Sequence, residues 1–138
     1  MEKEKNEEAE KMDYKEVARN NFSVWNEILQ TGNPQKISPL YEDGATFLPT
    51  VSPKFKKGRE EAAGYFEHFM AKNPKGEIKS EEIQVLGDNV YLHSGLYDFE
   101  LDGEEGRSIV EARFSYVWRR DNEGKWKIAH HHSSVKPK

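Results

Sequence analysis

Polar side chains near the C-terminal end of the chain have the chemistry of an acid–base or anion-binding site. A histidine or a carboxylate can act as a general base, and an arginine can hold an anion through parallel hydrogen bonds. Glu111, Arg113 and Ser115 alternate along one predicted strand, and His131 and Ser133 alternate along another, so that each set shares a face. If both faces are the inner ones, the sets line one pocket with a carboxylate from the neighbouring strand. The pocket candidates are Arg113, Glu111, Ser115, His131, Ser133 and Asp98.

Three arrangements agree with this set of residues. In a catalytic pocket, His131 or Asp98 acts as the general base. In a structural pocket, Glu111 or Asp98 neutralises Arg113 permanently, because a buried guanidinium stays protonated and must be paired. In a binding pocket, an anionic ligand neutralises Arg113, which then sets the charge preference of the site. The sequence leaves these alternatives open.

Three consecutive histidines, His130 to His132, have side chains that bind metals in other proteins. On a strand only His130 and His132 share a face, and two ligands are too few without a third. His93 belongs to another predicted strand, which the hairpin described next separates from them. We therefore predict no metal site and no cofactor, and we expect structural histidines in a sheet or an interface.

A long antiparallel hairpin from Ile109 to Val135 positions these residues. Two runs rich in β-branched and aromatic residues flank a polar turn at residues 121–124, which is the pattern of two paired strands. The strand face opposite Arg113 carries large aromatic side chains, and monomers seldom expose such an apolar area. We predict that this face packs against a second copy of the chain. The predicted oligomer interface consists of Phe114, Tyr116, Trp118, Trp126, His130 and His132.

Helical patterns come first in the remaining chain and extended patterns dominate later. Asp13 and Asn33 are predicted helix caps, and Gly32 is a predicted helix end. This order predicts an α+β fold, in which helices pack on a strongly curved antiparallel sheet that forms a cone-shaped open barrel. The expected helices are at residues 14–31, 34–40 and 58–72, and the expected strands before the hairpin are at 44–49, 77–86 and 90–101.

Length and composition fit one small domain. The 138 residues carry a net charge of -4, and 35% of them are hydrophobic. We predict a single domain at residues 13–138, after a charged tail at residues 1–12 that is flexible or helical. The acidic balance argues against nucleic acid as a partner, and no apolar run is long enough to span a membrane. Since no cysteine and no signal peptide are seen, we expect a cytoplasmic protein unless a leader peptide has been removed.

Four stretches of the sequence resemble one known family. They are residues 126–134 (WKIAHHHSS), 112–118 (ARFSYVW), 48–54 (LPTVSPK), and 86–89 (LGDN) together with 94–97 (SGLY). They resemble the association (hub) domain of calcium/calmodulin-dependent protein kinase II, and above all its stand-alone bacterial relatives. That group belongs to the nuclear transport factor 2-like, or SnoaL-like, superfamily. The resemblance covers about Asp13 to Pro137, and it implies a cone-shaped, cystatin-like α+β fold.

The resemblance also implies an assembly and a pocket. Association domains form dimers through the sheet, and in the kinases these dimers assemble into closed rings. Their deep pocket lies between helix and sheet, and arginines on the inner sheet face bind carboxylates there. These arginine positions fall on Leu96, Ser115 and Ser133, so the three cations are replaced and Arg113 is the nearest substitute. The implied partners are other copies of this chain and a small carboxylate or similar ligand.

Two functions follow as expectations. The first is a homo-oligomeric assembly module with a small-molecule pocket and no established chemistry. The alternative is a small enzyme, like the isomerases, dehydratases and cyclases of the superfamily, which uses general acid–base catalysis in the cone pocket. A kinase catalytic domain is not expected, because no glycine-rich phosphate loop with a following catalytic lysine can be found in the sequence.

Overall fold

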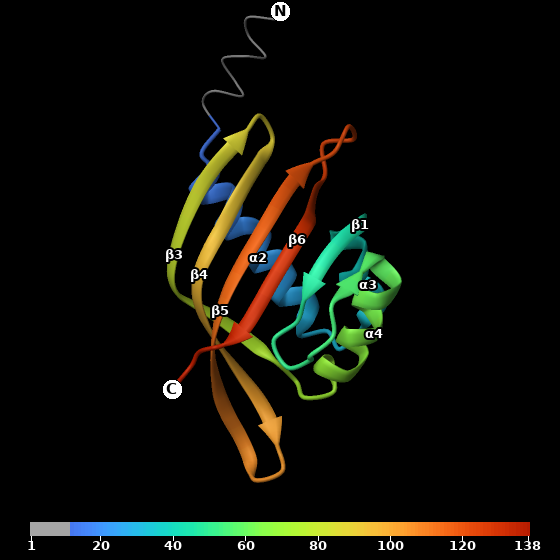
Figure 1. Ribbon diagram of the computed structural model, residues 1–138, viewed down its shortest axis with the longest axis vertical. Helices are drawn as coiled ribbons and strands as arrows, with labels where there is room; N and C mark the ends of the chain where they lie inside the picture. Colours follow the sequence, from blue (N-terminus) through green and yellow to red (C-terminus); the bar gives the residue numbers. More distant parts are fainter. Residues whose placement is uncertain (1–11) are drawn as a thin grey trace, which may run out of the picture.

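The computed structural model describes residues 12–138, so the predicted tail lies almost entirely outside the described residues. The chain alternates between helices and strands in its first half and then forms four consecutive strands (Figure 1). The elements are α2 (Tyr14–Leu29), α3 (Pro34–Ile37), the 3-10 helix η1 (Ser38–Leu40), β1 (Tyr41–Leu48), β2 (Lys56–Lys57), α4 (Gly58–Met70), β3 (Lys75–Gly87), β4 (Val90–Gly103), β5 (Gly106–Arg120) and β6 (Trp126–Val135).

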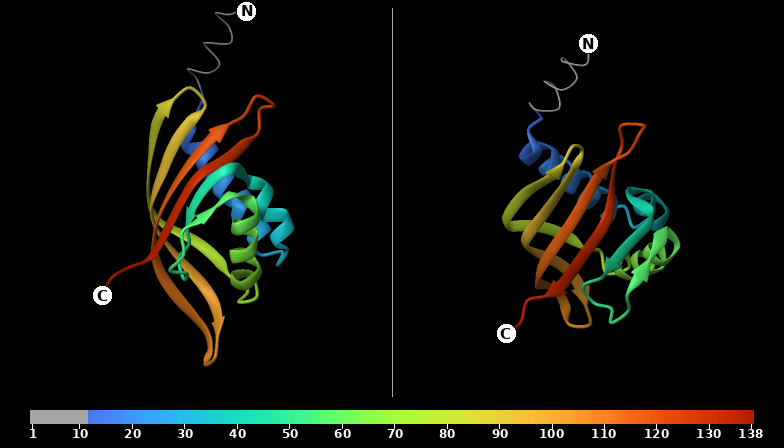
Figure 2. Two further views of the ribbon diagram at one scale, coloured as in Figure 1. Left: turned by 45° about the vertical axis from the view of Figure 1, so that its right-hand side comes forward. Right: turned by 45° about the horizontal axis from the view of Figure 1, so that its top comes forward.

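One six-stranded sheet runs in the order β2-β1-β6-β5-β4-β3. The strands β3 to β6 form the predicted antiparallel meander, whereas β1 pairs with β6 in parallel, so the sheet is mixed rather than purely antiparallel. The sheet curls around α2 without closing into a barrel, and α3 and α4 lie beside β1 (Figure 2). The α+β class and the open, curved form of the sheet are therefore confirmed.

Local signals set the boundaries of the helices. The carboxylate of Asp13 accepts hydrogen bonds from the backbone N–H groups of Lys15 and Glu16, which caps the first turn of α2. Asn33 caps α3 in the same manner, directly before Pro34. The helix α2 packs on the concave face of the sheet through its buried stripe Ala18, Phe22, Trp25 and Leu29.

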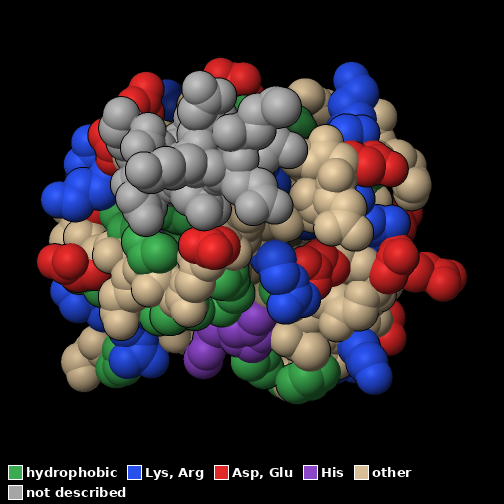
Figure 3. All heavy atoms as spheres, turned by 90° about the horizontal axis from the view of Figure 1, so that it is seen from above, with side chains coloured by type: hydrophobic (Ala, Val, Ile, Leu, Met, Phe, Trp, Pro, Cys, Tyr) green, Lys and Arg blue, Asp and Glu red, His purple; other side chains and the backbone are tan. Residues whose placement is uncertain are grey.

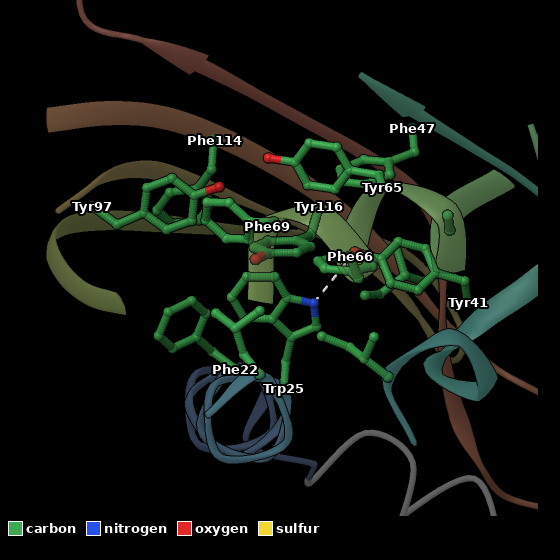
Figure 4. Packing of buried hydrophobic residues seen from close by; sticks show 14 of the residues in the cluster. Phe22, Trp25, Tyr41, Phe47, Tyr65, Phe66, Phe69, Tyr97, Phe114 and Tyr116 are labelled. Atoms are coloured by element: carbon green, nitrogen blue, oxygen red, sulfur yellow. Dashed lines mark hydrogen bonds between the residues drawn. The ribbon is translucent and has the colours of Figure 1, made fainter. Parts of the chain in front are cut away.

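Aromatic side chains from the sheet and the helices fill the space between α2 and the sheet (Figure 4). Phe114, Tyr116 and Trp118 belong to this core, and each is at most 3% exposed. The ring of Trp25 packs against that of Tyr116 with 5.8 Å between centroids. The prediction that these three aromatic residues form an exposed oligomer interface is therefore wrong, because α2 of the same chain covers their face of the sheet.

A β-bulge explains why the two faces of β6 were assigned incorrectly. Val117 pairs with His130 but Trp118 pairs with Ile128, so Ala129 is an extra residue on β6. Strict alternation would put Ile128 and His131 on opposite faces, yet both are buried in the interior. Each residue of β6 beyond the bulge therefore faces the side opposite to the one that simple alternation from Trp126 predicts.

Candidate functional site

The predicted pocket residues divide between the two faces of the sheet. His131 and Ser133 face the interior and are 1% and 3% exposed. They pair with Tyr116 and Phe114 of the inner face of β5. Glu111, Arg113, Ser115 and Asp98 have the opposite parity and lie on the outer face, where none of them is fully buried. The prediction that both sets converge on one pocket is therefore wrong.

Arg113 is exposed rather than buried. Its guanidinium donates to the Ser134 hydroxyl, with 3.3 Å from both Nε and Nη2 to Oγ. Within residues 12–138 it forms no ion pair with Glu111 or Asp98, although these two residues are opposite each other on β5 and β4. Since solvent can hydrate an exposed guanidinium, Arg113 needs no permanent counter-charge.

Trp126 lies at the margin of the core, where it is half-buried. Its ring contacts those of Tyr91 and Tyr14, with centroid distances of 5.2 and 6.4 Å. It therefore serves the packing of this chain rather than an exposed sheet face. Of the predicted interface residues, only His130 and His132 lie on the outer face of the sheet.

His131 is the centre of a buried polar cluster. Its imidazole ring is stacked between Tyr116, with 4.0 Å between centroids, and Phe47, with 4.7 Å. Nδ1 lies 2.9 Å from the Tyr41 hydroxyl, and Nε2 lies 3.3 Å from the Tyr97 hydroxyl. Both faces and both nitrogens of the ring are thus occupied by side chains of the same chain.

The hydrogen bonds around His131 have one consistent direction. The Tyr97 hydroxyl donates to Ser133 Oγ at 2.5 Å, so it accepts the bond from His131 Nε2–H. In the neutral ring Nδ1 is then the acceptor, and the Tyr41 hydroxyl donates to it. Trp25 supports this direction, because its indole N–H can only donate, and it donates to the Tyr41 oxygen at 3.3 Å.

The chain of hydroxyl groups continues toward the segment between β1 and β2. Ser133 has one proton, and because it accepts from Tyr97, its own proton is available to Thr50 Oγ1, with which it forms a short hydrogen bond. Thr50 lies two residues after the end of β1. The sequence of donors therefore runs from Trp25 on α2 to the loop between β1 and β2.

Burial determines the charge of every titratable member of the cluster. It holds the pKa of His131 well below its usual value, and the nearby His130 and His132 lower the pKa further. Burial also raises the pKa values of Tyr41, Tyr97 and Tyr116. The imidazole is thus neutral and the phenols keep their protons near neutral pH, which is the state that the hydrogen-bond directions require.

Acid is expected to destabilise the protein through its buried histidines. Burial lowers the pKa of both His131 and His93 in the folded chain, whereas an unfolded histidine titrates near about 6.5. Below that pH the unfolded state binds protons that the folded state excludes, so stability is complete above it and is lost as pH falls. The free energy of unfolding should fall by up to about 1.4 kcal/mol per pH unit for each histidine.

Urea unfolding at pH values between about 7.5 and 5.5 measures this slope. The variant His93→Leu removes one titrating group from a site where neither ring nitrogen has a hydrogen-bond partner among the described residues. Its slope should be smaller than that of the unmutated chain by up to about 1.4 kcal/mol per pH unit, the share of one histidine. A free energy of unfolding that stays constant across this range would show that these histidines bind protons as readily in the folded chain as in the unfolded chain.

The tyrosines of this cluster were not among the sequence-based candidates. The family resemblance placed two pocket positions at Leu96 and Ser115, which lie on the outer face of the sheet. The inner face at these places carries Tyr97 and Tyr116 instead. The alternation of Tyr91, His93 and Tyr97 along β4 was a usable signal, because it places polar tips at regular intervals on a buried face.

The outer face of β4, β5 and β6 has a centre with little charge. Val117 lies between Leu92 and His130, and Ser115 lies between Ser94 and His132. Neighbouring residues on the same face of β1, β4, β5 and β6 extend this surface, which we call the outer patch. Its members are Leu48, Leu92, Leu96, Val117, Thr46, Ser94, Ser115, Ser134, His130, His132 and Arg113.

Figure 3 shows histidine side chains gathered on the sheet side of the molecule, with hydrophobic side chains beside them. A depression of about 190 Å³ in the outer patch is lined by Arg113, Ser115, His132 and Ser134. An ion pair lies at its margin, where the guanidinium of Arg119 on β5 donates two hydrogen bonds to the carboxylate of Glu42 on β1. The outer patch therefore has apolar and hydroxyl groups at its centre and charges around it.

Two negative findings concern the described residues only. Within residues 12–138, no three His, Asp or Glu side chains form a group that could hold a metal ion. No helix in the same range combines the length and the apolar character needed to cross a membrane.

Comparisons with known proteins agree with this geometry. The family model for the calcium/calmodulin-dependent protein kinase II association domain matches residues 14–137. A crystal structure assigned as such a domain, from Xanthomonas campestris, is 40% identical, with a TM-score of 0.86 over 92% of this chain and 90% of that chain. A search of the curated proteins finds no match to the sequence.

More distant structures share the fold alone. A nuclear transport factor 2-like protein with a cystatin-like fold from Novosphingobium aromaticivorans is 14% identical, with a TM-score of 0.71 over 88% of this chain and 80% of that chain. A protein of the same family from Streptomyces avermitilis, assigned as a dehydratase, is 18% identical, with a TM-score of 0.76 over 89% and 96%.

Proposed function

The chain belongs to the calcium/calmodulin-dependent protein kinase II association domain family, and we propose that it is an assembly module whose copies associate through the outer patch. The observation that carries this proposal is the composition of that patch. Leu92, Leu96 and Val117 lie at its centre, partly accessible to solvent, and Arg113 is the one residue of the patch with a permanent charge. Apolar centres with polar margins are typical of surfaces that bind other proteins.

A second copy of the same chain is the partner that fits best. A two-fold interface brings one surface against itself, so the surface must carry both members of each complementary pair. The guanidinium of Arg113 lies within the outer patch, and Asp98 of β4 and Glu82 of β3 lie on the same face of the sheet. Rotation about a two-fold axis can therefore bring opposite charges together while the leucine and valine side chains pack at the centre.

Replacing Val117 by lysine is expected to dissociate the assembly. The new ammonium group would lie at the centre of the outer patch, where association would remove it from water without a counter-charge. The unmutated chain should sediment as a dimer or a larger ring, and Val117→Lys should sediment as a monomer. Sedimentation velocity measures the mass, and circular dichroism checks that the fold is intact.

Val24→Lys is the matched control. Val24 lies on α2, away from the outer patch, and is 38% exposed. This variant carries the same substitution but should assemble like the unmutated chain. A monodisperse monomer for the unmutated chain, or equal dissociation by both variants, would remove the outer patch from the proposal.

We do not assign catalysis to the interior cluster. A general base must reach the proton that it abstracts, either directly or through one water molecule. Both nitrogens of His131 are engaged by tyrosine hydroxyls, and aromatic rings cover both faces of its imidazole. These contacts support a structural role for His131 in the fold that presents the outer patch.

A further inference from the structure

A basic cavity of about 460 Å³ lies between the segment 51–56 and α4. It is lined by the side chains of Lys54, Lys56 and Lys72 together with His68 of α4. No aspartate or glutamate of the described residues belongs to its lining. Its volume lies within the range of about 300–1,000 Å³ that is usual for small-molecule sites.

The lysines of this cavity form no ion pair with the described part of the chain. Within residues 12–138 the ion pairs of lysine involve Lys79, Lys125 and Lys127 only. Like charges that line one concave surface repel each other, and low-dielectric walls focus the resulting potential. The cavity therefore attracts anions, and a bound anion would relieve the repulsion.

An aromatic wall closes the inner side of the cavity. The rings of Tyr65 and Phe69 stack with 5.4 Å between centroids and 24° between planes, and both residues line the cavity. Tyr65 is 7% exposed, and its hydroxyl has no hydrogen-bond partner within residues 12–138. In Figure 4 that hydroxyl points toward the hydroxyl of Tyr97, whose hydrogen-bonded chain ends at Thr50.

We propose that this cavity binds an organic phosphate monoester, with the phosphoryl group among Lys54, Lys56 and Lys72 and an apolar or planar body against Tyr65 and Phe69. Phosphate monoesters carry a charge of about -1.5 to -2 at neutral pH, which suits several cations better than a single carboxylate does. Lysine ammonium groups act as compact point charges that can surround a tetrahedral anion, whereas planar carboxylates are matched best by the arginine fork. The proposal is independent of assembly through the outer patch.

Phenyl phosphate is the probe that tests both parts of the site. Calorimetric titration should show saturable binding of phenyl phosphate, and weaker binding of benzoate and of inorganic phosphate, since each lacks one of the two features. The triple variant Lys54→Gln/Lys56→Gln/Lys72→Gln should bind phenyl phosphate at least about tenfold more weakly. Raising the salt concentration from about 50 to about 300 mM should also weaken binding by the unmutated chain, because salt screens exposed charges.

The triple variant Lys15→Gln/Lys36→Gln/Lys79→Gln is the matched control. These three lysines are exposed and do not line the cavity, so the same loss of charge should leave the affinity for phenyl phosphate unchanged. Equal weakening in both triple variants would show attraction by net charge rather than a site. Absence of saturable binding, or benzoate binding as tightly as phenyl phosphate, would overturn the proposal.

Discussion

Replacing Gly95 by alanine is expected to lower the free energy of unfolding by at least about 3 kcal/mol. A Cβ atom at this position would lie 2.0 Å from the backbone oxygen of Ser80 and 2.9 Å from the Cα atom of Glu81. The pairing of β3 with β4 shifts between Ile78 and Ser80, which leaves Lys79 as an extra residue at a bulge next to the contact. Because the obstacle is backbone, no rotamer change can relieve it, and the two strands must separate.

Gly64→Ala provides the matched control for Gly95→Ala. Gly64 lies inside α4, and a Cβ atom there would meet nothing within 4 Å. Since alanine has a higher helix propensity than glycine, this variant should be more stable by about 0.5–1 kcal/mol. Urea unfolding followed by circular dichroism measures both variants. A Gly95→Ala variant as stable as the unmutated chain would show that β3 can move away from β4 at little cost.

The order and type of the elements could be predicted because their signals are local. Asp13 and Asn33 cap their helices as predicted, through side chains that accept bonds from backbone N–H groups. The turn between β5 and β6 forms around Asp121, whose carboxylate accepts from the N–H groups of Glu123 and Lys125. Each of these signals involves residues a few positions apart, so the sequence alone contains the interaction.

The facing of the strands could not be predicted in the same way. Alternation assigns faces only within an uninterrupted strand, and the bulge at Ala129 reverses the assignment for the second half of β6. A bulge depends on how two strands pair, which the pattern of one strand does not contain. For β5 the predicted alternation was correct, but it does not say which face is the inner one. That depends on where α2 packs. Phe22 and Trp25 of α2 cover the face with Phe114 and Tyr116, which is therefore the inner face.

The buried cluster was harder to predict than the core around it. Tyrosine has an aromatic body and a polar tip, so Tyr41 and Tyr97 fit a core pattern whether or not their hydroxyls have partners. Their shared partner, His131, comes from a strand distant in sequence, and only the three-dimensional pairing brings the groups together. Arg113 shows the converse, because its charge and spacing suggested a buried site although it lies on an exposed face.

Replacing His131 by alanine is expected to lower the free energy of unfolding by about 3–5 kcal/mol. The change would leave a cavity between the rings of Tyr116 and Phe47, which now stack on the imidazole. It would also leave the hydroxyls of Tyr41 and Tyr97 without the partner that connects them. Both losses occur in the fully buried interior, where water cannot easily compensate for them.

Two further variants separate packing from hydrogen bonding at this position. His131→Phe restores an aromatic ring between Tyr116 and Phe47 but supplies no polar atom to the tyrosine hydroxyls, so it should recover only part of the lost stability. His68→Ala is the exposed control on α4 and should change the free energy of unfolding by less than about 0.5 kcal/mol. Urea unfolding measures the series. If His131→Ala were no more damaging than His68→Ala, the hydrogen-bonded chain from Trp25 to Thr50 would contribute nothing to stability, whereas full recovery in His131→Phe would assign the whole contribution of His131 to packing.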